Sequence, residues 1–239
     1  MHCSIYITFW RLNIIYYGLK NAIYIIAFFV IFFWAAYEQA GASLTLFAAE
    51  QTDRTIFGWE MPASWIQSFN PFFVVILAAI MPSVWGALNK RGMEPASPTK
   101  QAIGLLLLSL GYLVICFGVK DVQPGVKVSL IWLTGLYFIH TMGEIALSPI
   151  GLSMVNKLTP VRFASLMMGI WYLSTSTANK FAGTLGGLYP EDGKVKTLLG
   201  FRIETMFDFF MVFVIMSGVA SLILFLLSKK LQKMMHGVE

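Results

Sequence analysis

The feature that most constrains this chain is a series of six long apolar runs, separated by short polar links. The runs cover residues 21–49, 63–88, 99–119, 127–157, 160–188 and 205–228. Each is at least about as long as the 20 residues that a helix needs to cross a bilayer. Only 12% of the residues are charged, whereas a soluble chain carries about a quarter. The pattern therefore predicts an all-α membrane protein with six transmembrane helices.

The chain divides into three parts on this reading. Residues 1–20 form an N-terminal cytoplasmic segment, which could be the end of a linker. Residues 21–228 form the six-helix transmembrane bundle, and residues 229–239 form a basic cytoplasmic tail. The first apolar run is a membrane span and not a signal peptide, because it continues into further helix and has no small-residue cleavage site.

The distribution of lysine and arginine predicts the orientation. One set of helix ends carries most of these residues, namely Arg11, Lys20, Lys90, Arg91, Lys100, Lys157, Arg162, Lys229, Lys230 and Lys233. The opposite set is close to neutral. Since short cytoplasmic loops are rich in Lys and Arg, both termini are expected in the cytoplasm of a multi-pass protein of the inner (plasma) membrane. An even number of spans agrees with this orientation.

Several classes of function are disfavoured. The basic residues lie in loops and form no continuous face, so nucleic acid is not an expected partner. Cys3 and Cys116 lie far apart, and with His2, His140 and His236 they form no metal-binding or disulfide spacing. No nucleotide-binding or hydrolase motif is present. We therefore expect no enzyme activity and no cofactor.

Three charged residues lie inside the apolar runs: Glu38, Glu144 and Lys180. A charge at the centre of a span costs roughly 2.5–3.5 kcal/mol on insertion scales, so each should face the bundle interior or a water-filled cavity. Glu38 follows Lys20 by 18 positions, and Lys180 follows Arg162 by 18 positions. Both distances correspond to about 27 Å of helix. The two side chains could therefore pair in the outer half of the membrane, although Lys180 could also reach the interface by itself.

Glu144 lies deeper than the other two. It precedes Lys157 by 13 positions, which is about 20 Å of helix, and the sequence offers no partner at that height. A carboxyl group in a low-dielectric site can bind and release a proton near neutral pH, and it can also bind an ammonium group. The helix around it is weakened by Gly143, Pro149 and Gly151. This weakening fits either a cavity or an ordinary packing kink.

Polar and aromatic groups occur in two further spans. Trp171 and Ser174 lie in the fifth run, within a stretch of serines and threonines, and Asn70 precedes the apolar part of the second. Such groups can bond neighbouring helices, or they can surround a peptide backbone. The residues alone leave both possibilities open.

Three strings make a more specific case: FFWAAYEQAGASLTLFA, MPASWIQSFNPFFVVILA and GEIALSPIGLSMVNKLTPVRFASLMMGIWYLSTSTANKFAG. Together they resemble the proton-dependent oligopeptide transporter family of the major facilitator superfamily. That resemblance implies a fold of twelve helices in two halves, of which this chain resembles the second, helices seven to twelve. The first-half Glu-x-x-Glu-Arg signature and the helix-four lysine have no counterpart in the sequence.

The resemblance also implies roles for individual residues. Glu144 matches a glutamate linked to recognition of the peptide amino group and to the inner gate, and Glu38 matches one linked to proton coupling. Asn70, Trp171 and Ser174 match the peptide-binding pocket. Glu50 falls at an acidic outer-gate position, and Lys180 is assigned to the gate with it.

The expected function is therefore the C-terminal half of a proton-coupled di- and tripeptide symporter that forms one wall of a central site in the lipid bilayer. Its partner would be a separately encoded N-terminal half or a second copy of the chain. A truncated, non-transporting remnant or interaction protein is the alternative. A transporter of another solute is a third, weaker possibility.

Overall fold

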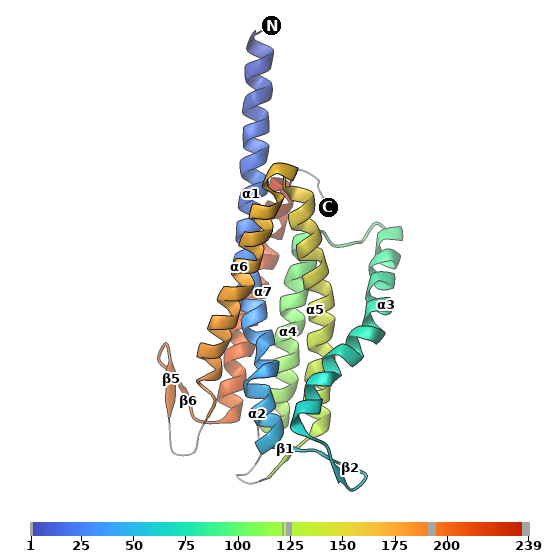
Figure 1. Ribbon diagram of the computed structural model, residues 1–239, viewed down its shortest axis with the longest axis vertical. Coiled ribbons are helices and arrows are strands. Elements are labelled where there is room, and N and C mark those ends of the chain that lie inside the picture. Colours follow the sequence, from blue (N-terminus) through green and yellow to red (C-terminus); the bar gives the residue numbers. More distant parts are fainter. Residues whose placement is uncertain (1, 121, 123–125, 191–194, 236–239) are drawn as a thin grey trace.

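Six long helices pack side by side in a computed structural model of the chain (Figure 1). The structure describes residues 2–120, 122, 126–190 and 195–235, with residues 2–17 described by their helix only. The long helices are α1 (His2–Tyr37), α3 (Phe69–Lys90), α4 (Ser97–Val119), α5 (Leu130–Leu158), α6 (Ala164–Gly186) and α7 (Met206–Met234). A short helix, α2 (Ser43–Glu50), extends the first span. All six apolar runs thus form helices.

Five of these helical segments are long and apolar enough to cross a membrane. They are Gly18–Glu50, Ala63–Lys90, Ser97–Val119, Leu130–Leu158 and Met206–Met234. Helix α6 has the same length as α4, 23 residues, but the polar residues of its second half make it less apolar. One side of α6 packs along α1, and most of its polar side chains lie on the exposed side.

The first helix begins earlier than the sequence suggested. Helix α1 starts at His2 and runs without interruption through residue 20, where the sequence-based division placed the end of a separate segment. Figure 1 shows the N-terminal part of α1 projecting beyond the rest of the bundle. The N-terminal end of α1 and the C-terminal end of α7 lie at the same end of the molecule (Figure 1).

The first span is interrupted near its middle. A 3-10 turn, η1 (Glu38–Gly41), separates α1 from α2. The buried side-chain amide of Gln39 donates to the carbonyl oxygens of Ala35 (3.2 Å) and Ala182 (2.9 Å). The Ser43 hydroxyl donates to Gln39 Oε1 at 2.6 Å. Irregular backbone is tolerated at membrane depth when protein groups satisfy it, and Gln39 performs this task while tying the break to α6.

Helix α4 forms the centre of the bundle, between α5 and α7. Small residues allow α4 and α5 to approach closely. A Cβ atom added to Gly104 would lie 2.8 Å from Leu147 Cβ and 2.9 Å from the Gly143 carbonyl oxygen. Tyr112 of α4 is fully buried, and its ring stacks on Phe213 of α7 at a centroid distance of 4.9 Å.

Helix α3 is attached much more loosely than α4. A 3-10 turn, η2 (Ala63–Ser68), leads into it, and it packs mainly against α5. Its other end diverges from the bundle (Figure 1). One side of α3 leaves a row of apolar side chains exposed: Phe72, Val75, Ile76, Ile80 and Val84.

The two ends of the bundle differ in structure and charge. We call the end that contains the N-terminal end of α1 and the C-terminal end of α7 the basic end. The opposite end, the strand end, contains three two-stranded ribbons. In the first, β1 (Thr52–Asp53) pairs in parallel with β4 (Val128–Ser129). The other two are hairpins, β2 (Thr55–Ile56) with β3 (Trp59–Glu60) and β5 (Lys196–Leu198) with β6 (Phe201–Ile203).

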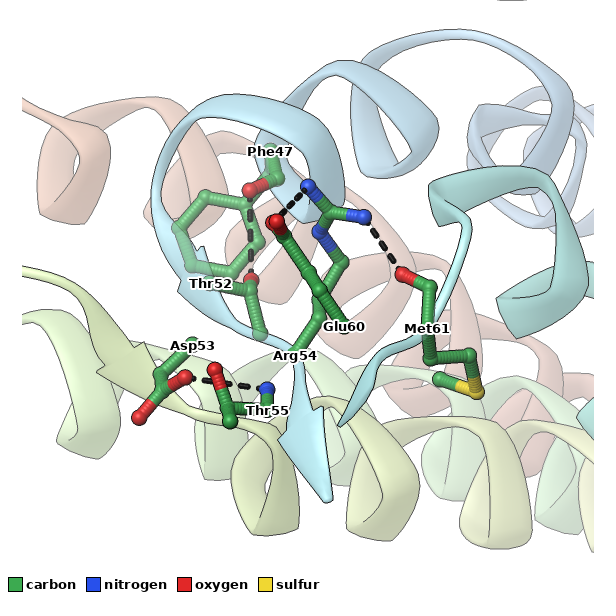
Figure 2. Close-up of polar contacts among 7 residues, drawn as sticks. All are labelled: Phe47, Thr52, Asp53, Arg54, Thr55, Glu60 and Met61. Atoms are coloured by element: carbon green, nitrogen blue, oxygen red, sulfur yellow. Dashed lines mark hydrogen bonds and ion pairs between the residues drawn. The ribbon is translucent and has the colours of Figure 1, made fainter. Parts of the chain in front are cut away.

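Arg54 fixes the base of the β2–β3 hairpin, as Figure 2 shows. Its guanidinium donates to Glu60 Oε1 at 2.7 Å and to the Met61 carbonyl oxygen at 2.5 Å. Asp53 Oδ1 accepts from the Thr55 backbone N–H at 3.0 Å. Hydrogen bonding to Thr55 holds the pKa of the Asp53 carboxyl below its usual range. The β2–β3 hairpin is therefore held by its own polar contacts.

Candidate functional site

The most connected polar cluster inside the bundle is centred on the carboxylate of Glu144. The Tyr37 hydroxyl donates to Glu144 Oε2 at 2.5 Å, and the Asn70 side-chain amide donates to the same oxygen at 2.9 Å. The Asn70 amide also contacts the Tyr37 hydroxyl and Thr141 Oγ1, the latter at 3.2 Å. We call these four residues the Glu144 cluster.

Three helices supply the Glu144 cluster. Tyr37 is the last residue of α1 before the 3-10 turn, and Asn70 is the second residue of α3. Thr141 and Glu144 are three positions apart on α5, so their side chains lie on one face. Glu144, Tyr37 and Asn70 are half-buried, whereas Thr141 is fully buried. The cluster therefore lies at a partly open surface between α1, α3 and α5.

Buried aromatic groups support the Glu144 cluster from behind. The Tyr37 ring stacks on Phe33 with a centroid distance of 5.5 Å. The imidazole of His140 lies 6.2 Å from the Tyr37 ring, and its Nε2 is 3.2 Å from the Leu108 carbonyl oxygen. Because a carbonyl oxygen only accepts, this Nε2 carries the hydrogen. Gly111 leaves the space for the imidazole, since an added Cβ would lie 2.4 Å from His140 Cδ2.

The charge of the Glu144 carboxylate is not balanced within the described part of the chain. Its two donors, a phenol and an amide, are both neutral, and none of the ion pairs among the described residues includes it. An unpaired carboxylate at membrane depth is unfavourable. It can become neutral by binding a proton, or it can bind a cation such as an ammonium group.

Glu38 is next to Tyr37 in sequence but points to a different environment. It is exposed, and it forms no ion pair or hydrogen bond within the described residues.

The predicted pair of Glu38 with Lys180 is not formed in this structure. Lys180 is exposed on α6, and neither side chain takes part in an ion pair among the described residues. The neighbouring residue takes this position instead. Gln39 faces α6, where its amide donates to the Ala182 carbonyl oxygen at 2.9 Å, and Glu38 is exposed.

Trp171 and Ser174 lie apart from the Glu144 cluster. Both are buried. The Trp171 ring packs against Gly151 of α5, where an added Cβ would lie 2.5 Å from Trp171 Cη2. The Ser174 hydroxyl donates to the Trp171 carbonyl oxygen of its own helix at 2.5 Å. In this arrangement both side chains contribute to helix packing.

Glu50 lies at the strand end, where α2 ends. It is the last residue of α2, and its carboxylate accepts from the Tyr189 hydroxyl at 3.3 Å. Burial, with the nearby Glu50 carboxylate, raises the pKa of the Tyr189 phenol. The phenol therefore remains protonated and donates to Glu50 over the physiological pH range.

A second polar cluster lies at the basic end. Glu94 accepts hydrogen bonds from Lys100 and Asn89, and these bonds hold the pKa of its carboxyl below the usual range. The Lys100 ammonium also lies 5.3 Å from the ring centroid of Trp85. A groove of about 550 Å³ between α3 and α5 connects this region with Ile145, the neighbour of Glu144.

Sequence reasoning found Glu144 and Asn70 but missed Tyr37, Thr141 and His140. The sequence did contain a signal for two of these residues, because each lies close in the chain to a charged residue inside a span. Tyr37 directly precedes Glu38, and Thr141 precedes Glu144 by nearly one helical turn. Among the described residues, no group of three or more His, Cys, Asp or Glu side chains could hold a metal ion.

Known proteins resemble this chain in sequence and in structure. The family model described as the POT family matches residues 20–199. A peptide transporter of Yersinia enterocolitica is 39% identical over 67% of this chain and 32% of its own length. The dipeptide and tripeptide permease A of Escherichia coli is 30% identical over 85% of this chain and 40% of its own length.

Solved structures give the same result. A peptide transporter mutant in complex with alafosfalin is 30% identical and superimposes with a TM-score of 0.79, over 92% of this chain and 43% of the other. A POT family transporter bound to 5-aminolevulinic acid is 27% identical, with a TM-score of 0.76 over 90% of this chain and 42% of the other. The chain thus spans less than half the length of these relatives.

Proposed function

Because this chain belongs to the POT family, we propose that it forms the C-terminal wall of the central site of a proton-coupled di- and tripeptide symporter. The family is a transporter family, and the relatives compared above are named as peptide transporters. The assignment to the C-terminal half rests on the order of the motifs in the sequence. The second wall would come from a separately encoded six-helix half or from another copy of this chain.

The observation that carries this proposal is the unbalanced Glu144 carboxylate at a partly open surface between three helices. A peptide presents an N-terminal ammonium group that can neutralise this carboxylate. Asn70 contacts the carboxylate through its amide, and an amide can also bond a peptide backbone. The contact between the peptide ammonium and the Glu144 carboxylate would be charge-assisted, and such contacts are roughly twice as strong as neutral hydrogen bonds. We assign the peptide amino group to Glu144 and an adjacent backbone group to Asn70.

Glu38 is the second acidic group in this proposal. It directly follows Tyr37, whose hydroxyl donates to Glu144. We assign Glu38 to proton binding, and binding of a proton there would favour binding of the peptide ammonium at Glu144. Release of either ligand would weaken binding of the other, as thermodynamic linkage requires. Rocking of the two walls would expose the site to each side in turn.

The basic end is assigned to the cytoplasm of a multi-pass inner-membrane protein. Lys90, Arg91 and Arg162 lie at that end in short links, and such links are positively charged on the cytoplasmic side. Both termini would then be cytoplasmic, and Glu50 would lie on the outer side.

The direct test is proton-driven dipeptide uptake by purified chain in liposomes, first alone and then with a co-expressed six-helix first half. We expect uptake only when the second wall is present, with loss of uptake in the Glu144→Gln variant. Glu60→Gln, which changes an exposed glutamate of the β2–β3 hairpin, is the matched control. If well-folded chain shows no uptake in either setting, the transport proposal fails. The remnant or interaction protein considered from the sequence is then favoured.

A further inference from the structure

The β5–β6 hairpin has an unusual tip. Its two-residue turn, Leu199–Gly200, has φ values of 49° and 86°. Positive φ at both central residues is typical of a type I′ turn, for which Asn-Gly or Asp-Gly is the preferred pair. Leucine is disfavoured in this left-handed conformation because of its side chain. Leu199 is therefore a large apolar residue at a turn position where asparagine or aspartate would fit the backbone better.

The tip is apolar and unsupported, whereas its base is fixed. Leu199 is fully exposed, and Phe201 next to the turn is exposed as well. At the base, Ile203 is fully buried. The Lys196 ammonium donates to the Tyr189 carbonyl oxygen at 2.8 Å. A capping box formed by Thr205 and Asp208 then starts α7. The base and Leu198, which packs against the core, hold the hairpin, whereas Leu199 and Phe201 extend from it into open space.

The position of the tip indicates what covers it. Figure 1 shows the β5–β6 hairpin turned back toward the basic end. Its tip lies at the edge of the bundle, near the height of the last turns of α6 and the first turns of α7. The four tip residues, Leu198 to Phe201, are uncharged, and Lys196 and Arg202 flank them. Apolar groups bordered by basic ones are characteristic of segments that lie in the membrane interface.

The β2–β3 hairpin provides a comparison within the same chain. Its turn, Phe57–Gly58, also has two positive φ values, 50° and 81°, and Phe57 is fully exposed. However, this hairpin extends outward at the extremity of the strand end (Figure 1). The two hairpins therefore share a turn geometry but differ in their height relative to the helices.

We infer that the β5–β6 hairpin is a membrane anchor whose tip, Leu199 with Phe201, inserts into the interfacial region of the lipid leaflet at the strand end. Insertion removes these apolar side chains from water, which offsets the unfavourable backbone of Leu199. The anchor fixes the start of α7 at a defined depth, because β6 ends at Ile203 and α7 begins at Met206.

The test measures the surroundings of a fluorescent label on the hairpin in liposomes of phosphatidylethanolamine and phosphatidylglycerol. Cys3 and Cys116 are first replaced by serine, and Thr197→Cys then provides a labelling site beside the tip. We expect quenching of this label by lipids with a shallow nitroxide, and little quenching by aqueous iodide. Strong quenching by iodide without quenching by the nitroxide lipid would overturn the inference.

A second variant separates lipid contact from folding. Leu199→Asn introduces the residue pair that the turn prefers and removes the apolar side chain, so the hairpin should remain folded. We expect the lipid-contacting fraction of the 197 label to fall about tenfold, the effect of losing roughly one buried leucine side chain. Phe57→Asn makes the same turn change in the other hairpin and should leave the 197 label unaffected. An unchanged label in Leu199→Asn would contradict membrane insertion.

Discussion

Two glutamates of this protein, Glu94 and Glu144, are held in nearly the same way but differ in charge balance. Each accepts a hydrogen bond from an asparagine amide and one from a second donor. For Glu94 the second donor is the ammonium of Lys100, and for Glu144 it is the hydroxyl of Tyr37. Glu94 lies in the link between α3 and α4, outside the spans, and Glu144 lies inside α5.

The difference shows how a structural carboxylate can be distinguished from a binding carboxylate. A neutralised ion pair at a helix end stabilises the link between two helices and has no remaining charge for a ligand. An ionised glutamate with two neutral donors is well positioned but still carries a charge that another molecule can neutralise. The following predictions change one feature of this comparison at a time.

Removing the charge of Glu144 should have the largest effect. In Glu144→Gln the shape of the side chain is kept, but the peptide ammonium loses its carboxylate partner. Hydrogen bonds to charged groups contribute about 1.5–3 kcal/mol, so we expect peptide affinity to fall by about tenfold to more than a hundredfold. Binding measured by calorimetry with a free and an N-acetylated dipeptide tests this prediction. Equal affinities of wild type and variant for the free dipeptide would contradict the role of Glu144.

Supplying a cation should convert the Glu144 cluster into a pair like that of Glu94. In Asn70→Lys the new ammonium lies beside Glu144 and competes with the peptide amino group. We expect peptide affinity to fall about tenfold or more, since an ion pair must be broken for binding, while Tm stays equal or rises. Asn89→Lys, the corresponding change next to Glu94, is the control and should leave affinity unchanged. Full affinity in Asn70→Lys would show that Glu144 does not receive the amino group.

Removing the Tyr37 hydroxyl should have a smaller effect. Tyr37→Phe preserves the stacking on Phe33 but deletes the 2.5 Å hydrogen bond to Glu144. The carboxylate then has one donor fewer and greater freedom. Affinity should fall about fivefold to tenfold, corresponding to roughly 1 kcal/mol. Tyr24→Phe on the same helix is a suitable control. If Tyr37→Phe were as severe as Glu144→Gln, Tyr37 would itself be a ligand of the peptide.

The smallest expected effect is the contribution of Glu94 to the pH dependence of protein stability. Its pKa in the folded protein lies below the ordinary value of 4.5. The Lys100–Glu94 pair therefore stabilises the fold above that value and loses its contribution as the pH falls through the lowered pKa. We expect wild type to exceed Glu94→Gln in Tm slightly at pH 7, and the difference to vanish in acid. A difference that grows in acid would contradict this assignment.

The sequence was sufficient to predict the helices because hydrophobic length alone determines them. All six runs became helices, and the family strings led to Glu144 and Asn70, which the structure brings together. The arrangement at residue 38 could not be predicted in the same way. The expected pair of Glu38 with Lys180 was inferred from helix length alone, which does not tell which side chain faces α6; in the structure Gln39 does, through its bond to the Ala182 carbonyl oxygen.

Side-chain environment was harder to predict than helix position. Trp171 was expected at a peptide pocket from the resemblance, and in this structure it fills the space that Gly151 leaves on α5. Tyr37 was not selected, because a tyrosine next to an acidic residue in a span has no distinctive pattern. Its importance arises only from the meeting of α1, α3 and α5, which involves residues more than 100 positions apart.

The glycine contacts between α4 and α5 have a mechanical consequence. Where Gly104 meets Gly143 and Leu147, the two backbones interlock too closely for either helix to slide along the other. Around this contact α4 and α5 would then move together and carry Glu144 with them. Bending would then occur in the loosely packed α3 and at the 3-10 turn after Tyr37. The two neutral donors of Glu144, Asn70 and Tyr37, lie on or next to these segments, so a change in the shape of either segment would alter the hydrogen bonds of the carboxylate.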